Sequence, residues 1–145
     1  MLTIFLLAAL LTVLTTLIHA GSTTAAFQWL RAHRDRFELA KLGPRKAVLL
    51  SGLVLVFLAA TLLEAALWAG AYLAVGAIEA FEPALYFSIV TFTTLGYGDL
   101  TLDDPWRLLA SFEAAVGIVM FGWTTAVIVT SVQKLYGAMM MRGEP

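Results

Sequence analysis

The 145-residue sequence has no cysteine and only two histidines, His19 and His33. Without cysteine the chain can form no disulfide, no thiolate metal site and no cysteine nucleophile. Two histidines so far apart do not fit a zinc motif such as H-E-x-x-H. Because no nucleophile–base pair or metal set can be assembled from the remaining residues, the sequence predicts a protein that is not an enzyme.

Charge is scarce as well: 13% of the residues are charged and 61% are hydrophobic. Soluble domains contain about 25% charged residues and about 45–50% apolar ones. A soluble fold of this size could not bury so much apolar surface. The net charge of −1 provides no basic excess for nucleic acid. The composition therefore predicts a membrane protein that lies in a lipid bilayer and does not bind nucleic acid.

Three apolar stretches are each long enough for a membrane-spanning helix, which needs about 17–25 residues. They cover residues 1–20, 47–78 and 106–136. The first could alternatively be a signal peptide cleaved at Ala20-Gly21, although it lacks the positively charged start of such signals. We expect it to be retained, which gives a single-domain, all-α protein with three transmembrane helices.

Lysine and arginine are concentrated in one segment. Six of the nine lie within residues 21–46, and none lies from Ala47 to Trp106. The positive-inside rule places residues 21–46 and the short tail 137–145 in the cytoplasm. The N-terminus then lies outside, and the expected location is the cell membrane, which the chain crosses several times. Trp68, Tyr72 and Trp106 are expected near the outer interface.

The basic segment 21–46 also carries an amphipathic pattern. Its apolar side recurs at spacings of three and four residues and comprises Ala26, Leu30, His33, Phe37 and Ala40. The pair Gly43-Pro44 ends the pattern, because proline cannot continue the hydrogen bonds of a helix. The segment is therefore predicted to form a helix on the cytoplasmic membrane surface.

A short helix is predicted over residues 83–93, with Pro83 at its first position, where a missing N–H costs nothing. Eleven residues make about 16 Å of helix, roughly half a bilayer. Irregular backbone at membrane depth is tolerated only where protein or a water-filled cavity surrounds it. This helix and the glycine-containing loop 94–99 are therefore predicted to enter the membrane and return on the same side.

The loop sequence Thr94-Leu95-Gly96-Tyr97-Gly98-Asp99 resembles the selectivity filter of potassium channels. The resemblance extends over residues 47–136, which are similar to the two-helix pore of that family. It implies an outer helix 47–78, a pore helix 83–93, a filter 94–99 and an inner helix 106–136. An ordinary glycine-rich turn between two helices is the alternative, but it needs neither the leading threonines nor a tyrosine between glycines.

The resemblance also implies which groups bind the ion. K⁺ exchanges its water shell for backbone carbonyls, and the carbonyls that match those of the family belong to Thr94, Leu95, Gly96 and Tyr97, together with the Thr94 hydroxyl. Gly96 and Gly98 suit the left-handed dihedrals that such a loop needs at alternate residues. One chain supplies one wall of the filter, so the predicted assembly is a homotetramer.

The sequence departs from the family pattern at several positions. Leu95 replaces the more usual valine but offers the same carbonyl. Val90 stands where some members carry a glutamate that bonds the filter aspartate, and Tyr86-Phe87 replaces a frequent tryptophan pair. We therefore expect the hydrogen bonds that brace Asp99 to come from other groups.

Two acidic residues, Glu64 and Glu113, interrupt the long apolar stretches. Intramembrane acids are costly unless they are paired or face the protein interior. Both fall at the level of the pore helix, so we predict that they support the filter by hydrogen-bonding the pore helix and filter backbone from behind. The alternative is that either one reaches water at the interface.

Acidic residues also surround the predicted filter: Glu79, Glu82, Asp99, Asp103 and Asp104. In four copies they would raise the cation concentration at the outer mouth. The alternative is a solvated acidic loop without that role.

Gly117 lies where the family places a flexible glycine in the inner helix, so it is a candidate gating hinge. The alternative is close helix packing, because Gly122 and Ala126 continue a pattern of small residues. The same alignment places Ile118, Phe121 and Thr125 on the ion cavity.

The sequence thus predicts a potassium-selective channel that conducts passively, with itself, lipid and K⁺ as partners and no regulatory domain in the chain. A weakly selective cation channel and a non-conducting membrane subunit remain alternatives. The gating stimulus and the role of the first helix are open.

Overall fold

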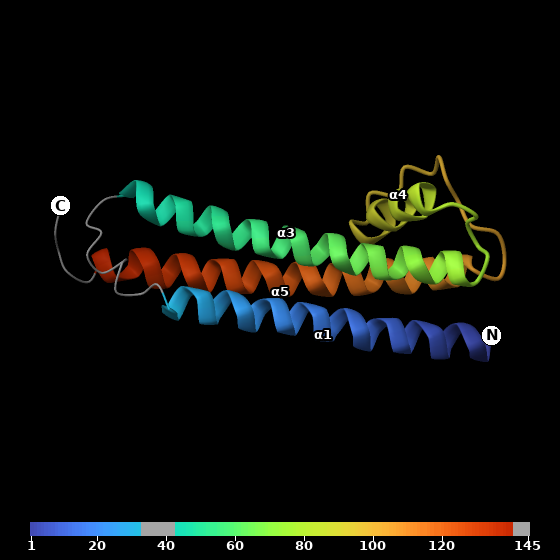
Figure 1. Ribbon diagram of the computed structural model, residues 1–145, viewed down its shortest axis with the longest axis horizontal. Coiled ribbons are helices and arrows are strands. Elements are labelled where there is room, and N and C mark those ends of the chain that lie inside the picture. The colour runs from blue at the N-terminus through green and yellow to red at the C-terminus, as the bar shows by residue number, and fades with distance from the viewer. Residues whose placement is uncertain (33–42, 141–145) are drawn as a thin grey trace.

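The computed structural model describes the backbone of residues 1–32 and 43–140 and the side chains of residues 1–32 and 47–134. The described chain consists of helices joined by turns and loops, and it contains no strand. Three long helices run side by side, and a short fourth helix lies at one end of the bundle (Figure 1). The all-α prediction is confirmed.

The long helices are α1 (Leu2–Ala32), α3 (Gly43–Ala74) and α5 (Arg107–Met140). Each contains an apolar stretch long enough to cross a membrane. α3 begins before the predicted residue 47, because a proline in the first turn lacks only an N–H that would be unbonded there. The three transmembrane helices predicted from hydropathy are therefore present, with shifted ends.

Helix α1 continues past the boundary predicted at residues 20 and 21. The Thr23 and Thr24 hydroxyls donate to the carbonyls of His19 and Ala20 at 2.9 and 2.8 Å, so these polar side chains are satisfied by their own helix. Ala26 is buried in the bundle. A separate interfacial helix over residues 21–46 was thus a wrong prediction for residues 21–32. Residues 33–42 lie outside the described residues, and residues 43–46 belong to α3.

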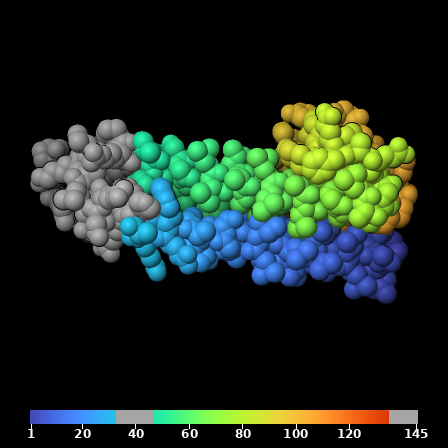
Figure 2. All heavy atoms as spheres, viewed as in Figure 1, coloured from blue at the N-terminus to red at the C-terminus, as the bar shows by residue number. Residues whose placement is uncertain are grey.

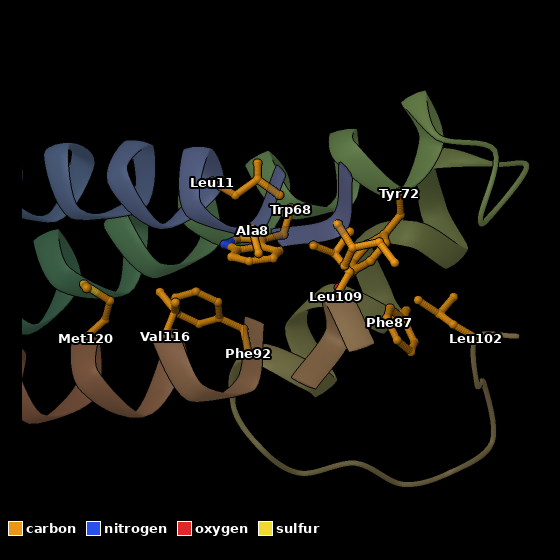
Figure 3. Packing of buried hydrophobic residues seen from close by; sticks show 11 residues of the cluster. Ala8, Leu11, Trp68, Tyr72, Phe87, Phe92, Leu102, Leu109, Val116 and Met120 are labelled. Carbon is orange, nitrogen blue, oxygen red and sulfur yellow. The ribbon is translucent and has the colours of Figure 1, made fainter. Parts of the chain in front are cut away.

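The core lies where α1, α3 and α5 meet. In Figure 3, Trp68 of α3 lies against Ala8 and Leu11 of α1, while Phe92 lies beside Val116 of α5. The Trp68 indole is fully buried and donates from Nε1 to Thr15 Oγ1 at 3.0 Å, so its polar atom has a partner.

Trp68 and Tyr72 are therefore core residues, and their predicted depth near the outer interface stays a prediction. Both have exposed fractions of 0%. Hydropathy places an aromatic residue near a helix end, but it does not tell which side of the helix faces the other helices.

Helix α4 covers Phe81–Phe92, two residues earlier at its start than predicted. Pro83 takes its third position, where an N–H would also have no partner within the helix. Twelve residues make about 18 Å of helix, too short to cross a bilayer.

Helix α4 packs on α3 and α5 at the end of the bundle that holds the N-terminus (Figure 1). In the same view α4 and its loop project from the α3 side of the bundle, and α1 occupies the opposite side (Figure 2). The loop that follows α4 is thus presented away from the first helix.

Candidate functional site

The loop Thr94–Asp99 leaves the C-terminal end of α4 and is exposed throughout in the single chain. Three of its residues have a positive φ, and they alternate along it: Thr94 at 61°, Gly96 at 54° and Gly98 at 80°. Leu95 and Tyr97, which lie between them, have negative φ. The loop therefore has the alternating backbone that was predicted to aim successive carbonyls at one axis.

Thr94 at positive φ was not predicted, since glycine is the usual residue in this region and a β-branched residue is rare there. The reason lies in how α4 ends. The Thr94 N–H donates to the Thr91 carbonyl at 2.9 Å, and the Leu95 N–H donates to the Val90 carbonyl at 3.0 Å. This pair of bonds is a Schellman motif, which requires a left-handed residue just after the helix. Thr94 is thus both the left-handed residue that ends α4 and the first residue of the loop.

Asp99, at the far end of the loop, is braced by Tyr86 of α4. The Tyr86 hydroxyl donates to Asp99 Oδ2 at 2.6 Å. This bond, followed by the backbone N–H groups of Asp99 and Leu100, holds the pKa of the Asp99 carboxyl below its usual range, against the opposing effect of desolvation. We expected the hydrogen bond to Asp99 to come from another group than in the family pattern. That group is Tyr86, which stands at one of the two positions where the family often has tryptophan.

Glu113 of α5 joins the three helices behind the loop. Its Oε2 accepts a 2.5 Å hydrogen bond from the Tyr72 hydroxyl of α3, and its Oε1 is bonded to the Ser88 hydroxyl of α4. Ser88 Oγ also lies 2.7 Å from the Ala65 carbonyl of α3, and its one proton can be donated to either acceptor. Glu113, Tyr72 and Ser88 are all fully buried. Glu113 thus contacts the predicted pore helix at the Ser88 side chain, and not at the backbone of that helix.

Glu64 does not contact the pore helix, and this part of the prediction was wrong. Its Oε1 lies 2.9 Å from Nδ1 of His19 on α1. Both side chains have exposed fractions of 0%, so Glu64 does not reach interfacial water either. Its partner is on α1 because the side of α3 that carries Glu64 is covered there by the first helix.

Gly117 of α5 lies directly against the last turn of α4. A Cβ placed on Gly117 would overlap the carbonyl oxygen of Phe92 and lie 2.9 Å from the carbonyl carbon. The absence of a side chain therefore lets the inner helix approach the point where the loop begins. This contact supports the packing role for Gly117, and its role as a gating hinge stays a prediction.

The residues predicted to line a cavity share one exposed side of α5. Ile118 and Phe121 have exposed fractions of 62% and 38%, and Thr125 is exposed as well. The Thr125 hydroxyl donates to the Phe121 carbonyl at 2.8 Å and keeps its lone pairs available. In the single chain nothing covers this apolar side of the helix over the described residues.

The acidic residues at this end of the molecule are also exposed: Glu79, Glu82, Asp99, Asp103 and Asp104. Asp104 faces Arg107 at 3.8 Å, and the pair is open to solvent. Among the described residues, no group of three or more His, Asp or Glu side chains is arranged to hold a metal ion. Binding of K⁺ by the backbone carbonyls of the loop stays a prediction.

Sequence reasoning missed His19, which lies between Glu64 and Thr124 of α5, and it missed the roles of Ser88 and Tyr72. A signal for His19 was present. An intramembrane base and an intramembrane acid in different helices each need a partner, and the two are obvious candidates for each other. Ser88 and Tyr72 carried no such signal, because isolated hydroxyls are common in membrane helices.

A family model described as an ion channel matches residues 47–134, more than half of the chain. The match covers α3 from Ala47, the whole of α4 and its loop, and α5 as far as Lys134. No solved structure matches the chain.

Proposed function

The chain belongs to this ion channel family, and from that premise we propose that four copies of it form a potassium-selective pore. The observation that carries the proposal is the alternation of φ at Thr94, Gly96 and Gly98 in a loop that follows a half-length helix. Such a backbone can direct the carbonyls of residues 94–97 to one side, where together they replace the water shell of K⁺.

The exposed surface around the loop supports an assembly of several copies. Tyr97 and Leu95 have exposed fractions of 67% and 58%, and Ile118 and Val119 of α5 have 62% and 61%. Large, exposed side chains beside an ion pathway would need to be buried against other protein chains. Neighbouring copies provide it if the loops meet at a common axis, with Tyr97 packed against the α4 helices as the family resemblance implies.

The position of α1 is compatible with that arrangement, because α1 lies on the side of the bundle opposite to α4 (Figures 1 and 2). Four loops can therefore converge while the four α1 helices stay at the periphery. The carbonyl end of each α4 would then point its partial negative charge toward the cavity lined by Ile118, Phe121 and Thr125.

The orientation proposed for the chain follows the distribution of charge. The loop end, which carries five exposed acids, faces outward with the N-terminus, and the basic segment 21–46 faces the cytoplasm. The acids would raise the local concentration of cations at the entrance. The proposed location is the cell membrane.

The proposal is tested by K⁺-driven flux into liposomes that contain the purified full-length protein, with barium block as the control for a filter. A matched pair of variants isolates the loop. Gly98 and Gly76 both have positive φ, 80° and 69°, and a Cβ on either meets no atom within 4 Å. Gly98→Ala should abolish flux, whereas Gly76→Ala, outside the loop, should keep it.

Flux that barium does not block, or equal flux of K⁺ and Na⁺, would favour a weakly selective cation channel. A tetramer verified in the membrane that conducts no ion would favour a non-conducting subunit. Equal effects of the two glycine variants would show that backbone strain in general, and not the loop, limits conduction.

A further inference from the structure

The most polar part of the membrane-spanning bundle away from the loop is centred on His19 of α1. Its Nδ1 lies 2.9 Å from Glu64 Oε1 of α3, and its Nε2 lies 3.2 Å from Thr124 Oγ1 of α5. One imidazole therefore connects three helices. His19 and Glu64 are fully buried, and Glu64 Oε2 has no hydrogen-bond partner among the described residues.

The groups that face His19 are few. Glu64 is the titratable group in contact with it, and α5 presents Thr124 and the ring of Trp123, whose centroid is 5.3 Å from that of the imidazole. The Phe57 ring of α3 covers it at 5.5 Å. Within the described residues, α1 itself adds no charged side chain near this position. The charge state of the site therefore depends on protons shared by His19 and Glu64.

Thr124 differs from the other serine and threonine residues of α5. These donate to the carbonyl one turn earlier, and they are Ser111, Thr125, Thr130 and Ser131. The Thr124 hydroxyl is bonded to His19 instead. Such bonds to the preceding turn affect the local curvature of a helix, so the partner of Thr124 matters for the shape of α5.

We propose that His19 and Glu64 form a proton-binding site within the membrane, and that Thr124 transmits its occupancy to the inner helix. With two protons on the pair, one lies between Nδ1 and Oε1 and the other is on Nε2, so His19 donates to Thr124. With one proton, it stays between Nδ1 and Oε1, and Nε2 accepts a bond from Thr124. Loss of a proton thus reverses the direction of the hydrogen bond on α5.

The reversal changes what Thr124 can do within its own helix. When its oxygen accepts from His19, its proton is free to bond the carbonyl of Met120, as the neighbouring hydroxyls do in their own turns. When it donates to His19, that proton is no longer available. Thr124 lies between Phe121 and Thr125, on the stretch of α5 that carries the proposed cavity residues.

The surroundings leave room for such a change. Thr124 and Phe57 also line a largely apolar pocket of about 270 Å³ between α3, α4 and α5, which is partly open to the outside of the single chain. Close-packed interiors resist small shifts, and an adjoining pocket lowers that resistance. The first helix thereby becomes a regulator of the pore, a step that rests on the proposed function, while proton binding and its coupling to Thr124 do not.

The site is tested first without any ion flux. The chain has only two histidines, so His33→Gln leaves His19 as the one imidazole that nitrogen NMR of the labelled full-length protein in lipid nanodiscs observes. We expect Nε2 to lose its proton as pH is raised across the range in which the protein stays folded, while Nδ1 keeps the proton that it shares with Glu64. Glu64→Gln should abolish or displace that change, and Thr124→Val should shift the proton affinity by about fivefold or more. Thr130→Val, the same substitution on a hydroxyl that does not contact His19, should leave it unchanged.

The regulatory step is tested in liposomes. The K⁺ flux of the wild type should vary with pH by about fivefold or more, and His19→Gln and Glu64→Gln should remove that variation. Thr15→Val loosens the same α1–α3 contact without removing a titratable group, so it should keep the variation.

Each possible result tests a different part of the proposal. A His19 ring whose protonation never changes, or a Thr124→Val effect no larger than that of Thr130→Val, overturns the proton site or its coupling. Unchanged pH dependence of flux in both His19→Gln and Glu64→Gln overturns regulation. If the NMR results hold and no sample conducts, the proposed channel function fails while the proton site stands.

Discussion

The Tyr86 hydroxyl donates a 2.6 Å hydrogen bond to Asp99 Oδ2, and this bond connects the middle of α4 to the far end of the loop Thr94–Asp99. The loop is also fixed at its start, where the Leu95 N–H donates to the Val90 carbonyl at 3.0 Å. Both ends of the loop are therefore anchored on the same short helix, and its conformation depends on that helix.

Removal of the hydroxyl in Tyr86→Phe should loosen the far end of the loop while leaving α4 intact. We expect sustained K⁺ flux to fall by about two- to tenfold, the factor that one exposed hydrogen bond supports. Phe81→Ala, at an exposed position at the start of the same helix, is the control. Flux in Tyr86→Phe equal to that of the wild type would show that the bond does not support the loop.

The same bond predicts a dependence on external pH. The pKa of Asp99 is lowered in the folded chain, chiefly by the Tyr86 hydroxyl, so its stabilising effect is fully present above the ordinary aspartate pKa of about 3.9. The effect is lost as pH falls through the lowered pKa. In a His19→Gln background, which removes the pH dependence proposed for the His19–Glu64 site, flux should thus stay constant from neutral pH to about pH 4 and decline below it. Adding Tyr86→Phe should make the decline begin at higher pH. A decline at the same pH in both proteins would contradict this assignment.

Glu113→Gln keeps the shape of the side chain but replaces an acceptor oxygen by an amide donor. Tyr72 can still donate to the amide oxygen, and Ser88 can accept one amide N–H while it donates to the Ala65 carbonyl, but the second amide N–H is then left without a partner in a buried site. The expected loss of stability is about 2 kcal/mol, measured as the denaturant or temperature at which the assembly dissociates. Glu82→Gln, the same change at an exposed position of α4, should have no effect. If Glu113→Gln altered neither assembly stability nor ion selectivity, Glu113 would not support the pore helix.

Gly117→Ala should destabilise the protein by about 2 kcal/mol or more, because the added methyl overlaps the Phe92 carbonyl and one of the two helices must move. Gly70→Ala is the matched control, since a Cβ on that helical glycine meets no atom within 4 Å. The control should be neutral or stabilising by up to about 1 kcal/mol. Thermal dissociation of the purified assemblies compares the two, and equal stabilities would mean that α5 does not approach α4 as closely as described.

The sequence was sufficient to predict features that depend on length, hydropathy and backbone chemistry. Three long apolar stretches predicted α1, α3 and α5, and the short stretch around Pro83 predicted α4. Gly96 and Gly98 were predicted to have positive φ and do, whereas the positive φ of Thr94 was not predicted. Each predicted feature is a local property, so it can be inferred without knowledge of the neighbouring helices.

Features that depend on how helices face each other could not be predicted in the same way. Glu64 and Glu113 were both predicted to lie at the level of the pore helix and to bond it. In the structure, Glu64 is hydrogen-bonded to His19 of α1 and Glu113 to Ser88 of α4. The choice depends on the rotation of each helix about its axis, which hydropathy does not specify. The end of α1 was missed for a related reason, because hydroxyl side chains can bond their own helix and so need not mark its end.

The central claim, that four copies of the loop select K⁺, is tested most directly by the reversal potential of the reconstituted wild-type protein with K⁺ on one side of the bilayer and Na⁺ on the other. The account predicts a reversal potential close to the equilibrium potential for K⁺, with current that barium blocks. A reversal potential near zero at equal concentrations of the two ions, or no current from a verified tetramer, would contradict it.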